Sequence, residues 1–248
     1  MKASEGFPVR LRFTEHGKVR FVSHRDVARG FERAFRMEQV PLAFTAGFSP
    51  RPKVSFGLAL SVGHESDAEY LDVELQDAVD VGALVGPLTD ALPDGIDVTG
   101  AVALVERAPA LQEAVTAVDY RIRPLGPRDE PVTADVLASL LDAAAAPDLP
   151  VTQVRKGEAR VVDVKPVIRH LELVHVGDTP VLELSLSTRP RGARPREVLD
   201  ALAAVAGVDG LAEGHVVRTA QWIERDGARM EPLEADALTR TLEEACAS

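Results

Sequence analysis

Four arginines recur at short intervals near the start of the chain. Arg25, Arg29 and Arg33 follow one another at intervals of four residues, and Arg36 stands close by. Residues three or four apart share one face of an α-helix. Neighbouring guanidinium groups repel one another unless an anion lies against them, and their planar forks match phosphate oxygens in pairs. The spacing indicates phosphate binding. The alternative is a solvated face with local pairs such as Glu32 with Arg36.

A second candidate is the loop over residues 46–57, AGFSPRPKVSFG, where Arg51 and Lys53 alternate with prolines. Prolines restrict the backbone, so they could display these two basic groups at low entropic cost. Phe48 precedes them and could stack on an unpaired base. The alternative is a structural loop that buries Phe48 and Phe56 under a sheet, and for Phe56 we favour burial.

Ser23, His24 and Arg25 stand at the expected start of a helix, where free amide donors and the helix dipole attract anions. His24 could exchange protons near neutral pH, and a histidine beside arginines suits RNA cleavage through the 2′-hydroxyl. A histidine at a helix start is more often a surface or capping residue. We therefore assign no catalytic residue and keep His24 as the one candidate for a metal-independent endoribonuclease.

The motifs of the commonest enzyme classes are missing from the sequence. It contains no phosphate-binding P-loop, no dinucleotide-binding glycine motif, no nucleophile elbow and no histidine or carboxylate spacing typical of a metal site. Its one cysteine, Cys246, cannot form a disulfide framework or a multi-cysteine zinc or iron–sulfur site within one chain. We predict no metal and no cofactor, and favour a protein that is not an enzyme.

Charge is distributed unevenly along the chain. The formal net charge is -11, which would repel a polyanion if it were spread evenly. Residues 1–53 nevertheless carry eleven basic and five acidic side chains, a local charge of +6, so the remainder carries -17. All eight phenylalanines also precede residue 57. The asymmetry predicts that an anionic partner binds the first part of the chain.

Two further arginines, Arg10 and Arg12, alternate with apolar residues on the first expected strand. They would lie on the open sheet face, where RNA-recognition modules carry stacking aromatic residues. Asp72 and Glu74 are expected on the neighbouring strand, so we favour cross-strand ion pairs. The prediction is that this sheet face does not bind RNA.

Hydrophobic periodicity and turn residues predict the elements that position these groups. The first half reads as strand, helix, strand, strand, helix and strand, and the same order follows after a linker. This order is that of a ferredoxin-like plait, so we predict an α+β fold of tandem ferredoxin-like (β-α-β-β-α-β) plaits with antiparallel sheets. The expected strands cover residues 9–14, 40–45 with 53–56, 68–75, 96–105, 117–124, 151–155, 160–174, 180–187 and 215–224. The expected helices cover residues 23–38, 80–92, 133–145 and 195–206.

Three segments follow from this reading. Residues 1–108 form an N-terminal domain with the basic and aromatic residues, and residues 115–225 form a C-terminal domain. Residues 226–248 form a tail with a short helix that carries Leu238 and Leu242 on one face. No run of eighteen apolar residues occurs and the first thirty residues carry several charges, which argues against a membrane span or a signal peptide. We expect a cytoplasmic protein.

Six short motifs in the first half resemble the signature of the radical-SAM-linked protein family, strongly over residues 8–76 and loosely beyond. These motifs are RFVSHRD at 20–26, FERA at 31–34, GFSPRPK at 47–53, SF at 55–56, VGHES at 62–66 and EYLD at 69–72. The resemblance implies an uncharacterised domain that occurs fused behind a radical-SAM enzyme or as a separate chain. Separate members tend to be encoded near an RNA-processing endonuclease and ribosomal proteins. Radical-SAM chemistry needs three cysteine thiolates, so this chain would be the stand-alone form.

These observations combine into one hypothesis, a non-catalytic RNA-binding or RNA-processing-associated module whose partner is RNA or a ribonucleoprotein. One alternative is the endoribonuclease that uses His24. The other is a protein adaptor for a radical-SAM or RNA-processing enzyme. The predicted phosphate contacts are Arg25, Arg29, Arg33, Arg51 and Lys53, with Phe48 as the stacking residue.

Overall fold

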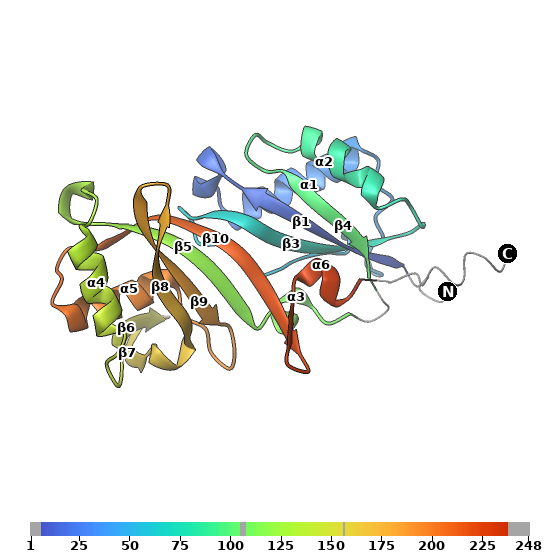
Figure 1. The fold of residues 1–248 in the computed structure, drawn as a ribbon. Coiled ribbons are helices and arrows are strands. Elements are labelled where there is room, and N and C mark those ends of the chain that lie inside the picture. Colours follow the sequence, from blue (N-terminus) through green and yellow to red (C-terminus); the bar gives the residue numbers. More distant parts are fainter. Residues whose placement is uncertain (1–5, 105–107, 156, 238–248) are drawn as a thin grey trace. The chain divides into compact units, whose positions relative to one another are not determined.

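The computed structural model describes residues 6–104, 108–155 and 157–237 (Figure 1). Their contacts form two compact units. The first holds the described residues up to Val62, Ser66–Ala114 and those from Arg225 onward, while the second holds Gly63–Glu65 and Val115–Glu224. Helices and antiparallel strands occur in both units, so the protein is α+β. No helix among the described residues is both long and apolar enough to cross a membrane.

The first unit is an antiparallel sheet with helices on both faces. Its strands have the order β4-β1-β3, and β2 also pairs with β3. Figure 1 shows α1 and α2 on one face and α6 on the other. The elements are β1 (Phe7–Glu15), α1 (His24–Met37), β2 (Val54–Phe56), β3 (Glu65–Leu75), α2 (Val85–Ala91), β4 (Val98–Ala103), α3 (Leu111–Ala114), β11 (Ala228–Met230) and α6 (Pro232–Ala235).

Helix α1 forms because its sequence combines a start signal with a helical apolar stripe. The side chain of the N-cap residue Ser23 accepts a hydrogen bond from the Asp26 amide at 3.3 Å, as the S-x-x-D pattern predicts. Val27, Phe31, Ala34 and Phe35 are buried on the inner face. The ring of Phe31 packs edge-on against Phe13 of β1, with centroids 4.8 Å apart. The outer face is left to polar residues.

The connection after α1 differs from the prediction. Residues 40–45 are not a strand, because only isolated bridges join Leu42 to Leu75 and Phe44 to Pro52. The pairing strand is β2, which matches Val54 to Val73 and Phe56 to Leu71. Its short length follows from the prolines that precede it, since proline donates no ladder hydrogen bond.

The second unit has the strand order β10-β5-β9-β8, again antiparallel, and β6 and β7 form a separate two-stranded sheet. The expected strand over 160–174 is instead two strands, divided by the 3-10 turn Lys165–Val167, because Pro166 lacks an amide donor. The elements are β5 (Ala117–Leu125), α4 (Ala134–Ala143), β6 (Pro150–Arg155), β7 (Glu158–Asp163), β8 (Ile168–Val176), β9 (Thr179–Ser187), α5 (Pro195–Ala206) and β10 (Ala212–Arg225).

Part of the predicted tail cannot be compared with the structure. The short helix expected around Leu238 and Leu242 lies outside the described residues, as does Cys246. The described part of the tail is β11 and α6, which are grouped with the first unit.

Candidate nucleic-acid interface

The outer face of α1 carries the predicted arginine stripe. Arg25, Arg29, Arg33 and Arg36 are all exposed, on the side of the helix away from its buried apolar stripe. Nη1 of Arg29 lies 3.0 Å from Oδ1 of Asp26. Within the described ranges, the other three guanidinium groups have no hydrogen bond or ion pair. The helix therefore presents three uncompensated positive charges.

Among the residues that the structure describes, Asp26 is the one carboxylate that pairs with an arginine of this face. Its Oδ2 accepts a hydrogen bond from the Ser23 hydroxyl at 2.7 Å, and its Oδ1 accepts from Arg29. The Ser23 hydrogen bond, followed by the hydrogen bond and charge of Arg29, lowers the pKa of Asp26 below its ordinary value of 3.8. Glu32 makes no ion pair with Arg36 in the described structure. The alternative of local pairs along the stripe thus holds only for Arg29.

The loop after α1 displays Phe48 and Arg51. The amide of Thr45 donates to the carbonyl of Arg51 at 2.9 Å, and the amide of Arg51 donates to Thr45 Oγ1 at 3.0 Å, which closes the loop. Phe48 lies between these anchors and is fully exposed, with a relative exposure of 105%. The alternative that buries Phe48 is wrong. Phe56 is half-buried and packs against Phe31 with centroids 5.8 Å apart, so it belongs to the core edge.

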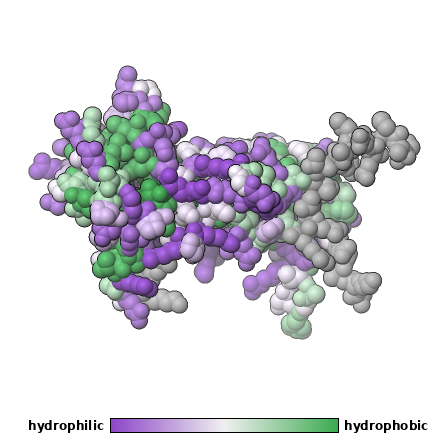
Figure 2. All heavy atoms as spheres, turned by 60° about the horizontal axis from the view of Figure 1, so that its bottom comes forward, coloured by the Kyte–Doolittle hydropathy of each residue, from purple (hydrophilic) through white to green (hydrophobic). Residues whose placement is uncertain are grey.

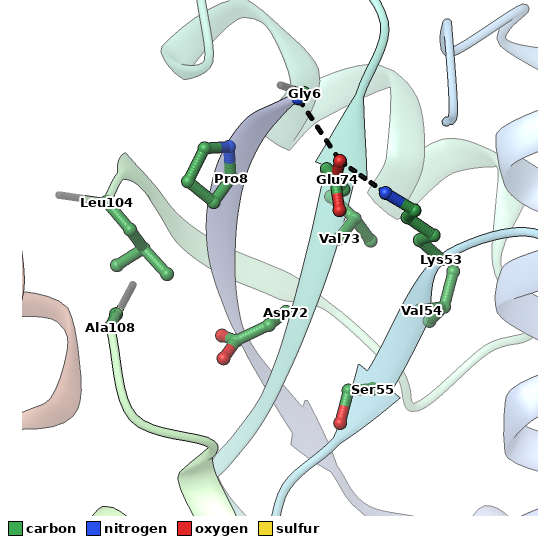
Figure 3. Close-up of a pocket in the computed structure, with 10 residues that line it drawn as sticks. All are labelled: Gly6, Pro8, Lys53, Val54, Ser55, Asp72, Val73, Glu74, Leu104 and Ala108. Carbon is green, nitrogen blue, oxygen red and sulfur yellow. Dashed lines mark hydrogen bonds and ion pairs between the residues drawn. The ribbon is translucent and has the colours of Figure 1, made fainter. Parts of the chain in front are cut away.

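Lys53 faces a carboxylate instead of open solvent. Its Nζ lies 2.6 Å from Oε1 of Glu74, and the same oxygen accepts from the amide of Gly6 at 3.1 Å (Figure 3). These residues line a pocket of about 490 Å³, together with the carboxylate of Asp72 and the hydroxyl-bearing Ser55. Glu74 compensates the ammonium group of Lys53, and the second carboxylate, Asp72, pairs with Arg10, so the described lining offers an anion no uncompensated positive charge.

His24 is exposed at the start of α1 and has no polar partner in the described part of the chain. Its ring lies edge-on to Phe56, with centroids 5.1 Å apart and an angle of 79° between the planes. A general base is normally oriented by a second hydrogen bond, which this arrangement does not provide. Among the described residues, no group of three or more His, Cys, Asp or Glu side chains is arranged to hold a metal ion.

The opposite sheet face of the first unit is closed by a buried ion network. Arg10 is fully buried and donates to both oxygens of Asp72, Nε to Oδ1 at 2.7 Å and Nη2 to Oδ2 at 2.9 Å. Its Nη1 donates to Asp236 Oδ2 at 3.3 Å and to the carbonyl of Pro232 at 3.1 Å, while Arg225 holds Asp236 Oδ1 at 2.6 Å. Burial is the largest single influence and lowers the pKa of Arg10. The hydrogen bonds and charges of Asp72 and Asp236 together outweigh burial, so the pKa is raised above its ordinary value.

The predicted cross-strand pairs are half correct. Arg10 pairs with Asp72 as expected. Arg12 pairs instead with Glu231 at 3.7 Å and donates to the Asp67 carbonyl at 3.1 Å, so the predicted partner Glu74 is wrong. No local pattern in the sequence points to Glu231 or Asp236 as partners, because they are more than 200 positions away from Arg10 and Arg12 along the chain. This sheet face is covered by α6 and offers no platform for bases.

The predicted contacts lie along one helix and one loop. Arg25 and Arg36 are separated by roughly 16 Å along the axis of α1, at 1.5 Å per residue. The chain turns back at the C-terminal end of this helix, where the Val40 amide donates to the Phe35 carbonyl at 2.9 Å, and enters the loop of Phe48 and Arg51. The loop therefore follows the Arg36 end of the helix, while His24 marks the other end.

Comparisons with known proteins give one family and several distant structures. A family model described as "Uncharacterized protein conserved in bacteria (DUF2344)" matches residues 9–195. No curated protein matches the chain.

Three solved structures illustrate the distant similarity. One is a Cbf5-Nop10-Gar1 complex, at 13% identity over 87% of this chain and 49% of that chain, with a TM-score of 0.48. Another is an H/ACA RNP bound to a substrate RNA containing 2'-deoxyuridine, at 13% identity over 89% and 48%, with a TM-score of 0.43. The third is an unknown protein from Galdieria sulphuraria, at 10% identity over 86% and 96%, with a TM-score of 0.27. The chain spans about half the length of the first two. At these identities and TM-scores the likenesses assign neither a fold nor a function.

Proposed function

Since this chain belongs to the DUF2344 family of uncharacterized proteins conserved in bacteria, we propose a function from its own surface, that of a non-catalytic module that binds RNA or associates with RNA processing. The observation that carries the proposal is the outer face of α1. It places Arg25, Arg33 and Arg36 side by side without a carboxylate partner among the described residues, in a chain of net charge -11. An acidic protein that keeps three free guanidinium groups on one helix face is suited to an anion with repeated charges.

Phe48 favours single-stranded RNA over a duplex. A ring that is exposed on all sides can stack on a base only if that base is unpaired, and stacking of this kind tolerates any base sequence. In the proposal Arg25, Arg33, Arg36 and Arg51 contact phosphates and Phe48 stacks. The two remaining predicted contacts, Arg29 and Lys53, stay in the set but contribute less, because each holds a carboxylate.

The proposal also includes the fold, the domains and the setting. The strand orders β4-β1-β3 with β2 beside β3, and β10-β5-β9-β8, support two tandem ferredoxin-like plaits. The domain boundaries 1–108 and 115–225, with the tail 226–248, remain predictions, as does a cytoplasmic location. The link to radical-SAM enzymes rests on the sequence motifs alone, and it makes a radical-SAM enzyme or a ribonuclease the protein partner to look for.

The test compares two variants with equal charge change. Arg25→Gln/Arg33→Gln/Arg36→Gln removes the free guanidinium groups of α1, and a control removes three arginines from the sheet of the second unit, Arg121, Arg123 and Arg169. Binding of the full chain to a single-stranded RNA oligonucleotide is measured at several salt concentrations. We expect the wild type and the control to bind with a steep salt dependence. In the α1 variant the slope of log affinity against log salt falls by about 2, at about 0.7 per phosphate contact.

Three outcomes separate this proposal from its alternatives. Equal RNA binding by the α1 variant and the control would overturn the assignment. RNA cut to products with a cyclic phosphate by the wild type but not by His24→Ala would show the endoribonuclease. A protein partner that co-purifies after nuclease treatment, in the absence of any RNA binding, would show the adaptor.

A further inference from the structure

A further pocket, with two arginines in its lining, lies within the second unit. It has a volume of about 380 Å³ and is lined by Gln153, Glu158, Arg160, Val162 and Arg191. The first four come from the β6–β7 hairpin and the last from the connection between β9 and α5. Gln153 and Arg160 are cross-strand partners, so their side chains share the face of the hairpin that borders the pocket.

The other face of this hairpin is apolar and exposed. Val154 and Val161 have relative exposures of 70% and 66%. Figure 2 shows hydrophobic surface gathered at the end of the picture that holds α4, α5 and the hairpin, with hydrophilic surface around it. By the strand alternation, Gln153 and Arg160 lie on the opposite face, and the buried Val162 lies on that face with them.

Gln153 is a buried amide with an unused donor. Its relative exposure is 7%, and its Oε1 accepts a hydrogen bond from Nη2 of Arg191 at 2.8 Å. A guanidinium group can only donate, so this contact fixes which end of the amide faces Arg191. Nε2 is left buried, without a partner among the described atoms. A buried donor without an acceptor costs free energy, which an anionic oxygen would recover.

The connection that carries Arg191 is unusually basic and is held in place. Residues 188–196, TRPRGARPR, contain four arginines and no carboxylate, in a stretch of the chain that is otherwise strongly acidic. Thr188 anchors it, since its amide donates to the Thr116 carbonyl at 3.0 Å and its hydroxyl donates to the Val115 carbonyl at 2.6 Å. Of the guanidinium groups, only Arg196 holds a carboxylate in the described structure, Asp200 at 2.8 Å.

We propose that this pocket binds a phosphate group. Arg160 and Arg191 supply positive charge from two elements that are distant in sequence, and the amide of Gln153 supplies a neutral donor between them. Among the described residues of the lining, Glu158 is the one carboxylate, so the basic groups outnumber it two to one. The volume exceeds that of a phosphate ion alone, so the pocket has room for the nucleotide or RNA strand that would carry the phosphate. The site lies in the second unit and stands whether or not α1 binds RNA.

The test uses a substitution that keeps the contact to Arg191. Gln153→Glu retains an oxygen acceptor for Arg191 but replaces the free donor by a carboxylate that repels phosphate. Arg160→Gln removes charge from an exposed residue that has no ion pair in the described structure. Gln76→Glu, at an exposed position of the first unit, repeats the charge change of Gln153→Glu as a control.

Binding of the full chain to inorganic phosphate, to AMP and to a short RNA is followed by NMR on side-chain amide and guanidinium signals. We expect AMP or RNA to shift the Gln153 amide signal in the wild type, in Gln76→Glu and in the α1 triple variant. Gln153→Glu and Arg160→Gln should each weaken this binding ten-fold or more. Inorganic phosphate alone binding as tightly as AMP would assign the site to free phosphate and overturn the nucleotide assignment.

Two further results would overturn the phosphate site itself. One is the absence of any shift at Gln153 with all three probes. The other is equal binding by Gln153→Glu and Gln76→Glu. Weaker RNA binding by the α1 triple variant, with AMP still bound at Gln153, would support both sites separately. RNA bound equally by the wild type and the α1 triple variant, with AMP bound at Gln153 in both, would reject α1 while supporting this pocket.

Discussion

Oε1 of Glu74 holds the ammonium group of Lys53 at 2.6 Å and the amide of Gly6 at 3.1 Å. Lys53 is thereby drawn toward β3, although its neighbour by two positions, Arg51, is exposed without an ion pair in the described structure. Two basic residues of one loop thus have different electrostatic environments. Their spacing in the sequence predicts the same role for both residues. The register of β2 on β3 places Lys53, and not Arg51, beside Glu74.

The first prediction compares these two residues. Arg51→Gln and Lys53→Gln remove the same charge from the same loop. Because Lys53 is already compensated by Glu74, we expect Lys53→Gln to change RNA affinity less than two-fold. Arg51→Gln should weaken RNA binding by several-fold and lower the salt slope by about 0.7. Fluorescence anisotropy with a labelled single-stranded RNA measures both, and a larger loss with Lys53→Gln would contradict the assignment.

The second prediction concerns Asp26, the carboxylate that holds Arg29. Asp26→Asn releases Arg29 to the outer face of α1, so RNA binding should tighten by more than in Glu32→Gln, which makes the same charge change without breaking an ion pair. Equal gains in the two variants would show that only net charge matters. Circular dichroism on both variants checks that α1 remains helical after the change at its first turn.

The same carboxylate predicts a limited pH response. The pKa of Asp26 is lowered in the folded protein by the Ser23 hydroxyl and Arg29, so its stabilising effect is complete above the ordinary value of 3.8 and is lost as pH falls through the folded value. Helix α1 should therefore show no change from this group between pH 7 and 5. NMR titration of the Asp26 carboxyl carbon should show a midpoint below 3.8, and a midpoint above it would contradict the Ser23 contact.

The third prediction separates stacking from simple apolar contact at Phe48. Phe48→Leu keeps an apolar side chain but removes the flat ring, while Phe48→Tyr keeps the ring. Loss of one stacked base costs about 1–3 kcal/mol, so Phe48→Leu should weaken single-stranded RNA binding by roughly five-fold or more. Phe48→Tyr should bind as the wild type does. Equal affinities for all three proteins would remove Phe48 from the interface, and because the side chain is fully exposed, none of them should differ in stability.

Sequence patterns predicted an element correctly where neighbouring residues determine it, as in α1. Ser23 and Asp26 indicate the start of α1, and the spacing of the apolar residues that follow indicates its inner face. The sequence alone therefore places the arginines on the outer face of this helix. The strand assigned to 40–45 failed because extended residues beside prolines pair only where a neighbour strand is available. No local signal distinguishes a paired extended segment from an unpaired one.

Local sequence patterns do not predict contacts between segments that are far apart in the chain. Nothing near Asp236 in the sequence indicates that it meets Arg10, 226 positions earlier. The basic connection over residues 188–196 was not predicted for a different reason. The net charge of residues 54–248 is strongly negative, and four arginines change that total only slightly. Over residues 188–196 alone the charge is +4.

The last prediction concerns the buried network that α6 closes. Asp236 is almost fully buried and compensates two guanidinium groups, those of Arg10 and Arg225, at 3.3 Å and 2.6 Å. Asp236→Asn leaves Arg10, itself without solvent contact, with only Asp72 as a counter-charge. Removing one partner of a buried ion pair costs about 3–5 kcal/mol, because the remaining charge is then buried without full compensation.

Urea unfolding of Asp236→Asn should therefore show a large loss of stability. Asp200→Asn is the matched control, since it breaks the exposed pair with Arg196 on α5, which is worth about 0.3–0.5 kcal/mol. A loss no greater than that of the control would mean that α6 does not stay packed on β1 in solution. In that case the sheet face that carries Arg10 and Arg12 would be open to solvent. This face would then be a second candidate, besides α1, for binding RNA.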